Sequence, residues 1–450
     1  MVVKIEKSRL FGVAEFPPSK SDSHRLIIAA ALCQGESVIS GISLCDDVLA
    51  TIESLRALGA EISLSGNVAH VRGIDIRKSA ALRELPVGES GSTLRFLIPL
   101  ALMTGNRIRF VGKERLFRRP LSVYEEIAKK YGAEFEISDS RLEVCGNIQS
   151  GEYRLRGDIS SQFITGLLFA LPLLQGDSKI IIEPPFESRP YVDMTVATLG
   201  KFGIEVQFED ENTIAVKGGQ KYTRGNFSSE GDWSGGAFLF ALGLLHPDIK
   251  VSGYDASSLQ GDKVCVEYFE RIKSAAVGAT YGGAADSACA RVTCGGAADS
   301  AYARVTCGEA ADSACARGAC GTPIIDISDC PDLGPVLFAM AAYFGEAEFY
   351  GTRRLLIKES DRASAMAAEL QKFGARLEIY ENSVKVFGGN LHEPSEALCG
   401  HGDHRIVMSL AVLCSIFGGE IRGAEAIGKS YPEFFEVFSS LGGNIRILEN

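Results

Sequence analysis

The feature that most constrains this chain is a unit of about 70 residues that recurs six times along its 450 residues. In each copy an amphipathic helix is followed by a glycine and then by a strand. The glycine stands where a helix ends in a left-handed residue. These glycines, 68 to 75 residues apart except for one interval of 96, are Gly59, Gly132, Gly203, Gly278, Gly374 and Gly442.

A second kind of helix, apolar on nearly every side, precedes each copy. A helix of that kind is buried in a core rather than lying on a surface. The six begin, each with a polar or glycine-rich start, near Ser23, Ser92, Ser161, Ser234, Pro331 and His404. The sequence therefore predicts an α/β protein of two domains with three units each, whose polar helix starts can meet in one cleft. Six unrelated helix–strand pairs in an ordinary α/β protein are the alternative.

We place the first domain at 16–229 and the second at 1–15 plus 230–450. The long interval falls in the second domain, where 282–320 holds three near-copies of one 13-residue sequence. We interpret this segment as a tandem duplication within a strand hairpin at the edge of the domain. Its Ala, Gly and Ser content favours a surface excursion. Metal binding by its cysteines is the weaker interpretation, because their spacing follows the duplication.

Composition excludes several classes of protein. A net charge of −11 argues against a general nucleic-acid or membrane-surface binder, so any anion site must be a local basic cluster. The longest apolar runs, such as 163–174, fall short of the ~20 residues that span a bilayer. The N-terminal residues resemble neither a signal nor a transit peptide. Seven of the twelve cysteines lie outside the duplication, in apolar segments, which predicts reduced thiols in a cytoplasmic protein, and no Cys/His spacing resembles a zinc site.

The polar helix starts are rich in groups that bind anions. Segment 20–25 precedes an apolar run, where free backbone N–H groups and the helix dipole favour phosphate. A capped helix with solvated charges explains that hexapeptide equally well. The glycine- and serine-rich loop 88–95 can bring backbone amides close to an anion, but it lacks the Gly-Lys-Ser/Thr of a P-loop. Cations at equivalent places in a repeat suggest substrates that carry several negative charges.

Nine motifs at these starts are specific in combination: KSDSHR at 20–25, GESGSTLR at 88–95, RRP at 118–120, SSQF at 160–163, SRPY at 188–191, LQGD at 259–262, PDLGP at 331–335, KESDR at 358–362 and DHR at 403–405. With them the chain resembles the 5-enolpyruvylshikimate-3-phosphate synthase family, whose members join phosphoenolpyruvate to shikimate 3-phosphate. The resemblance runs from Pro17 to Pro432 and leaves out only the duplicated segment, roughly 274–322. It implies a two-domain, inverse α/β barrel-like fold with three βαβαββ units in each domain and the active site in the interdomain cleft.

The resemblance also implies two sets of ligands, carried over position by position. The shikimate 3-phosphate site would use Lys20, Ser21, Arg25, Ser160, Ser161, Gln162, Ser188, Tyr191, Asp332 and Lys358. The phosphoenolpyruvate site would use Lys20, Gly91, Arg119, Gln162, Arg362, Arg405 and Lys429. The family's chemistry needs no metal or organic cofactor. We expect these two small molecules as partners, neither nucleic acid nor membrane, and a monomer.

In the family mechanism the 5-hydroxyl of the shikimate attacks C2 of the enolpyruvate while C3 is protonated, and the tetrahedral intermediate then loses phosphate. A carboxylate must take the hydroxyl proton, and Asp332 is the candidate. Glu359 and Lys20 are the candidates for the proton transfers at C3. Cations at the periphery suit a reaction in which phosphate and carboxylate are held while positive character develops at C2.

Two departures from the family pattern stand out. Arg354 occupies the place of a usual Asn four residues before the KESDR lysine, which puts that ligand in doubt. Pro18 replaces a glycine that often precedes the first motif, and the ligands themselves are kept. Gly91 is retained where glyphosate-resistant members carry a larger residue, so we expect glyphosate to compete with phosphoenolpyruvate.

Three other interpretations remain. The nearest is the enolpyruvyl transferase acting on UDP-N-acetylglucosamine, which shares the sixfold architecture but has a cysteine where this chain has Glu114. A non-catalytic anion-binding relative would have lost Asp332, Glu359 or Lys20, all of which are present. An enzyme damaged by the duplication would bind substrate without turnover, and deletion of 26 residues of repeat would then raise its activity.

Overall fold

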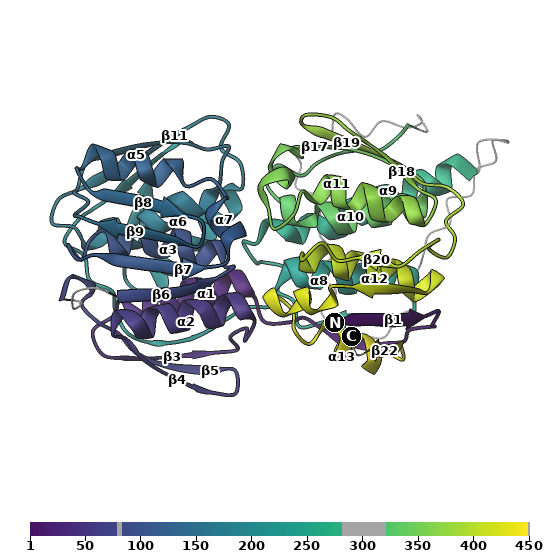
Figure 1. Ribbon diagram of the computed structural model, residues 1–450, viewed down its shortest axis with the longest axis horizontal. Helices are drawn as coiled ribbons and strands as arrows, with labels where there is room; N and C mark the ends of the chain where they lie inside the picture. Colours follow the sequence, from purple (N-terminus) through teal and green to yellow (C-terminus); the bar gives the residue numbers. More distant parts are fainter. Residues whose placement is uncertain (79–82, 281–320, 449–450) are drawn as a thin grey trace.

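The computed structural model describes residues 1–78, 83–280 and 321–448. The chain forms two lobes that lie side by side (Figure 1). It crosses between them twice, at 16–19 and 229–232, and these two crossings pair with each other. Ser19 N–H donates to the Glu230 carbonyl at 2.8 Å, and Asp232 N–H donates to the Pro17 carbonyl at 2.8 Å. The duplicated segment 282–320 lies outside the described residues.

The first lobe contains three four-stranded sheets of one pattern. In each sheet a parallel pair is extended by two antiparallel strands. In spatial order the sheets are β14 (Asn226–Ser228), β3 (Glu36–Ser40), β5 (Val68–Arg72), β4 (Glu61–Ser65); β6 (Arg83–Gly88), β7 (Ile108–Gly112), β9 (Arg141–Cys145), β8 (Glu134–Ser138); and β10 (Glu152–Arg156), β11 (Ser178–Glu183), β13 (Thr213–Val216), β12 (Val206–Phe208).

The second lobe repeats the pattern in two sheets and shows part of it in a third. The third sheet has two strands among the described residues. The sheets are β20 (Leu398–Cys399), β21 (Gly419–Arg422), β1 (Val2–Glu6), β22 (Asn444–Leu448); β16 (Ile324–Asp326), β17 (Glu346–Tyr350), β19 (Ser383–Phe387), β18 (Arg376–Ile379); and β15 (Ile249–Ser252), β2 (Gly12–Glu15).

The six apolar helices are buried, as the sequence predicts. Polar side chains cap most of their N-termini: Ser19, Ser90, Ser160, Asp232 and Asp403 each accept a backbone N–H from the first turn. The buried helices are α1 (Lys20–Ala31), α3 (Gly91–Ala101), α6 (Ser161–Ala170), α8 (Trp233–Leu245), α10 (Gly334–Phe344, after the short helix η4, Pro331–Leu333) and α12 (His404–Phe417).

The amphipathic helices end as predicted at five of the six glycines. Gly59, for example, follows α2 with φ +113°, a value that suits glycine because it has no Cβ. The prediction for Gly278 is wrong, because α9 continues through it to Thr280. The outer helices are α2 (Asp46–Leu58), α5 (Ser122–Lys130), α7 (Arg189–Lys201), α9 (Cys265–Thr280), α11 (Arg362–Lys372) and α13 (Phe434–Ser440). Short helices are η1 (Ile76–Lys78), α4 (Glu114–Phe117), η2 (Leu171–Leu173), η3 (Gly261–Val264), η5 (Arg353–Ile357) and η6 (Ala424–Lys429).

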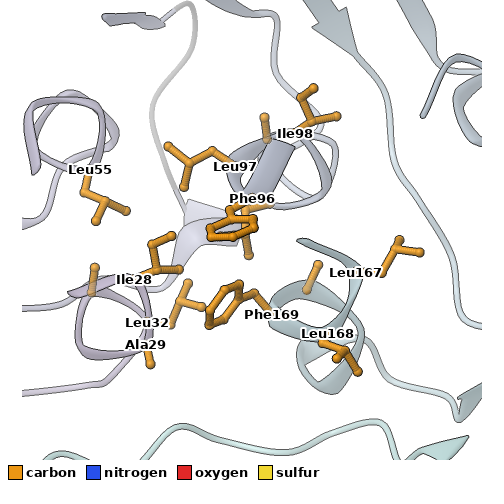
Figure 2. Close-up of a cluster of buried hydrophobic side chains, with 14 of the residues drawn as sticks. Ile28, Ala29, Leu32, Leu55, Phe96, Leu97, Ile98, Leu167, Leu168 and Phe169 are labelled. Carbon is orange, nitrogen blue, oxygen red and sulfur yellow. The ribbon is translucent and has the colours of Figure 1, made fainter. Parts of the chain in front are cut away.

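Each lobe has its own hydrophobic core. One core takes buried residues from 26 to 222, and the other takes them from 3 to 16 and from 233 to 441. In the first, side chains of α1, α2, α3 and α6 face one another, with Phe96 and Phe169 at a ring-centroid distance of 5.9 Å (Figure 2). Two cores are what the proposed domain division requires, and the boundaries themselves stay a prediction. In the described ranges no helix combines the length and the apolar character needed to cross a membrane.

Candidate active site

A cleft between the lobes is lined by the polar helix starts of both. Its walls include most of the side chains predicted from the sequence: Lys20, Ser21, Arg25, Gly91, Arg119, Ser160, Ser161, Gln162, Ser188, Tyr191, Asp332, Lys358 and Glu359. Three predicted ligands do not line it. Arg362 and Arg405 lie directly behind Asp332, and Lys429 lies at the cleft edge.

The start of α1 is fixed by the crossing between the lobes. Asp232 accepts the backbone N–H of Lys20 at 3.1 Å with one carboxylate oxygen and caps α8 through Gly235 N–H at 3.0 Å with the other. One carboxylate therefore holds the first helices of both lobes at the cleft. Arg25 is oriented by a bond from its Nε to Thr195 Oγ1 at 2.9 Å and one from Nη2 to the Tyr191 carbonyl at 2.8 Å.

The starts of α3 and α6 meet around a shared set of polar groups. Gln162 accepts from Arg95 Nη1 at 2.9 Å and donates to Ser92 Oγ at 3.0 Å. The absence of a side chain at Gly91 makes room for two guanidinium groups, since a Cβ there would lie 2.9 Å from Arg95 Nη1 and 3.0 Å from Arg119 Nη1. Burial lowers the pKa of Arg95 to about 10, and its cationic form leaves a positive charge at this helix start.

Asp332, on the opposite wall, is held by three cations. Its Oδ1 lies 2.6 Å from Arg362 Nη1 and 3.2 Å from Lys358 Nζ, and its Oδ2 lies 3.1 Å from Arg405 Nη2. Burial raises the pKa of this carboxyl, but the three cations outweigh burial and hold the pKa well below its ordinary value. Asp332 is therefore ionised at neutral pH and can accept a proton.

Glu359 and Lys20 lie on facing walls of the cleft. Glu359 pairs with Arg362 Nη2 at 2.6 Å, and its Oε1 lies 3.9 Å from Arg119 Nη1 of the first lobe. Burial opposes ionisation of Glu359, yet Arg362 and Arg119 keep its pKa well below the usual range. Lys20 Nζ lies 3.2 Å from Asp47 Oδ2. Burial lowers the pKa of Lys20, but the negative charges of Asp47 and Glu359 raise it, and the net pKa is raised. Lys20 is therefore protonated at neutral pH.

Sequence reasoning missed three charged residues of the cleft. Asp47, Arg95 and Arg354 all line it. In the sequence, Asp47 is a first-turn carboxylate of α2 and Arg95 lies one turn inside a buried helix. Arg354 is only a departure from the family pattern. The signal for Arg95 was its place within a turn of the predicted polar helix start near Ser92, whereas Asp47 opens an outer helix and carried no such signal.

Lys429 differs from the other predicted ligands in its present contacts. Its ammonium bonds to Glu89 of the first lobe and to the Gly402 carbonyl at 2.7 Å. Glu89 also pairs with Lys113 at 3.0 Å. Burial raises the pKa of Glu89, but Lys429 and Lys113 outweigh burial and lower it. This cluster bridges the lobes at one edge of the cleft.

The architecture and the cleft together define a two-lobed α/β protein that gathers anion-binding groups between its lobes. EPSP synthase from Acinetobacter baumannii has this fold, with a TM-score of 0.73, 21% identity and full coverage of both chains. The enolpyruvyl transferase NikO from Streptomyces tendae is similar at a TM-score of 0.70 and 16% identity, over 99% of this chain and 98% of that one.

The sequence comparisons go further than the fold. The pattern of the EPSP synthase (3-phosphoshikimate 1-carboxyvinyltransferase) family matches residues 5–438. A 3-phosphoshikimate 1-carboxyvinyltransferase of Clostridium perfringens is 39% identical over 99% of both chains, and one of Clostridioides difficile is 35% identical over 98% of both. The chain therefore belongs to the EPSP synthase family, a family of transferases.

Proposed function

We propose that this enzyme transfers the enolpyruvyl group of phosphoenolpyruvate to the 5-hydroxyl of shikimate 3-phosphate and releases phosphate, a step of aromatic amino acid biosynthesis. The observation that carries the proposal is the charge of the cleft, since six cationic side chains face three acidic ones. The cations are Lys20, Arg25, Arg95, Arg119, Arg354 and Lys358, and the acids are Asp47, Asp332 and Glu359. An excess of positive charge suits two substrates that each carry a phosphate and a carboxylate. We further propose that the enzyme is a cytoplasmic monomer.

Asp332 is our candidate for the general base. Its carboxylate is kept ionised by its three cations, and it lies in the same cleft as the hydroxyl-rich start of α6. In the proposed step the 5-hydroxyl oxygen forms a bond to C2 of the enolpyruvate and its proton passes to Asp332. General base catalysis by a positioned side chain typically contributes 10²–10⁴-fold in rate, about 3 to 5 kcal/mol.

Lys20 is our candidate for the proton donor to C3, because its raised pKa keeps it protonated at neutral pH. Glu359 is ionised and suits the reverse task, which is to accept a proton from C3 when the tetrahedral intermediate loses phosphate. In that second step the bond from C2 to the phosphate oxygen breaks and the C2–C3 double bond forms again. Arg119, Arg362 and Arg405 would stabilise the phosphate and carboxylate of the donor.

A phosphate-release assay tests the proposal. The purified chain is mixed with phosphoenolpyruvate and either shikimate 3-phosphate or UDP-N-acetylglucosamine, and released phosphate is measured with time. We expect release that depends on shikimate 3-phosphate and none with the nucleotide sugar. Release with UDP-N-acetylglucosamine would favour the neighbouring transferase, and release with neither acceptor would favour a non-catalytic relative.

A further inference from the structure

Arg354 enters the cleft from the second lobe and reaches the first. Its side chain, 6% exposed, belongs to η5, and its Nη2 donates to Ser188 Oγ at 2.8 Å. Its Nη1 lies 3.2 Å from Glu187 Oε2 and donates to the Ser328 carbonyl at 3.3 Å. The guanidinium therefore joins the two walls while part of it still faces the cleft.

Ser188, whose hydroxyl accepts a hydrogen bond from Arg354, has an unusual backbone conformation. Its φ is +57°, and in the described part of the chain only one other non-glycine residue, His401, has a positive φ. Such conformations cost free energy and concentrate at ligand clamps. The hydroxyl is thus held at a fixed place beside Arg354, in the cleft that Ser160 and Ser161 also line.

The charges around Arg354 are unbalanced. Glu187 is its acidic partner, and partial burial raises the pKa of that carboxyl although Arg354 lowers it. Lys358 lines the same cleft. Burial and the nearby guanidinium of Arg354 lower the pKa of Lys358 to about 8, although Asp332 raises it. Two neighbouring cations on one wall of a cleft favour an anion beside them, and a planar guanidinium beside hydroxyl groups suits a phosphate.

We propose that Arg354, with Ser188, binds the phosphate group of the acceptor and sets the preference for a phosphorylated over an unphosphorylated acceptor. The inference rests on the proposed function and adds a specificity residue where the family pattern has a neutral amide. A guanidinium can pair with a phosphate dianion, which gives the acceptor an ion pair that a neutral side chain lacks.

The test compares two ligands that differ by one phosphate. Shikimate 3-phosphate and shikimate are each titrated calorimetrically into the wild-type chain, Arg354→Gln and Arg354→Lys. We expect Arg354→Gln to weaken binding of shikimate 3-phosphate by roughly tenfold to a hundredfold, the range for a hydrogen bond to a charged group, and to leave shikimate binding unchanged. Arg354→Lys keeps the charge and recovers most of the loss.

Two further variants serve as controls. Arg353→Gln alters the neighbouring arginine, which is 44% exposed, pairs with Asp158 of the first lobe and does not line the cleft. The affinities for shikimate 3-phosphate and for shikimate should both stay unchanged. Glu187→Gln removes the competing carboxylate and should keep or tighten shikimate 3-phosphate binding. If Glu187→Gln weakens binding as much as Arg354→Gln, the pair merely holds the lobes together and the proposal is wrong.

The remaining outcomes are equally decisive. An equal loss for both ligands in Arg354→Gln would assign Arg354 to the ring hydroxyls or carboxylate, and no loss would remove it from the site; either result overturns the proposal. Failure of the proposed function appears separately, as a wild-type chain that releases no phosphate. The titrations need binding alone, so a chain that binds without turnover still decides the role of Arg354.

Discussion

At the scale of single residues, the buried carboxyls of the cleft differ in pKa according to the cations that surround them. Asp332 and Glu359 have lowered pKa values because arginines outweigh the penalty of burial. Asp262, buried and 2.5 Å from the Tyr191 hydroxyl, lacks such pairing, and burial together with Asp332 raises its pKa to about 6. Position relative to guanidinium groups thus decides whether the pKa of a buried carboxyl in the cleft is lowered or raised.

Replacing Asp332 with Asn should remove the proposed base. We expect kcat to fall by about 10²–10⁴-fold, with little change in the KM for phosphoenolpyruvate, in a steady-state phosphate-release assay. The matched control is Asp329→Asn, the same change at an exposed carboxylate three residues earlier, which should keep wild-type kcat. A folded Asp332→Asn variant with normal kcat would exclude this residue as the base.

Replacing Asp262 with Asn should change how stability depends on pH. The pKa of Asp262 is raised to about 6 in the folded protein, whereas the pKa of an unfolded Asp is about 3.9. Between about pH 4 and 6 the folded state therefore binds one more proton than the unfolded state. Stability contributed by this group is therefore present below about pH 4 and lost as pH rises through 6. We expect Asp262→Asn to be more stable than wild type at pH 8, by about 1 to 3 kcal/mol, and nearly equal near pH 4. Thermal midpoints at pH 4.5 and 8 check this, and a difference independent of pH would contradict it.

At the scale of elements, the helix starts position the site. Each cap is a local feature of the sequence, such as Ser90, whose Oγ accepts the Thr93 N–H at 3.1 Å. That is why the starts of the buried helices were predictable. Gly278 was not, because a glycine in a repeat does not by itself end a helix when the following residues continue it.

Gly91→Ala should act through the arginines beside the start of α3. The added Cβ lies within 3.0 Å of Arg95 and Arg119, so both guanidiniums must shift. We expect the KM for phosphoenolpyruvate and the inhibition constant of glyphosate to rise by about tenfold or more, the equivalent of one weakened charged hydrogen bond, while the KM for the acceptor stays near wild type. Gly200→Ala in α7, where a Cβ meets no atom within 4 Å, is the control and should leave all three constants unchanged. Inhibition by glyphosate that does not compete with phosphoenolpyruvate would contradict the expectation.

At the scale of the whole molecule, ion pairs join the lobes at both edges of the cleft. Lys429 with Glu89 bridges one edge, where the two side chains are 15% and 19% exposed. Arg353 with Asp158 bridges the other at 2.9 Å, with the arginine 44% exposed. Solvent screens the second pair more strongly than the first.

Double-mutant cycles should rank these two bridges. For Arg353→Gln and Asp158→Asn we expect a coupling energy below about 1 kcal/mol, as for an exposed pair. For Lys429→Met and Glu89→Gln we expect about 1 to 3 kcal/mol, because the pair is largely shielded and charge-assisted. Unfolding free energies from urea titrations give both values, and the reverse order would show that burial does not decide the strength of these bridges.

The sequence predicted the sixfold repeat, the buried helices and most of the cleft, because periodic hydrophobicity, caps and motifs are local signals. It did not predict which groups stand behind others. Arg362 and Arg405, which the sequence predicts as donor ligands, both contact Asp332, while Arg354 reaches the cleft only because η5 meets the first lobe. Such placements depend on how the two lobes meet, which no short stretch of sequence records.

The pairing of β1 governs the order in which this protein can fold as it is made. Val2 pairs with Arg422 on one side and Leu448 on the other, so β1 finds both neighbours only after β21 and β22 have left the ribosome (Figure 1). The first lobe is complete once β14 emerges near residue 228 and can close while the rest is still being translated. Until β21 and β22 emerge, β1 is an unpaired edge on the nascent chain, exposed to unwanted strand pairing.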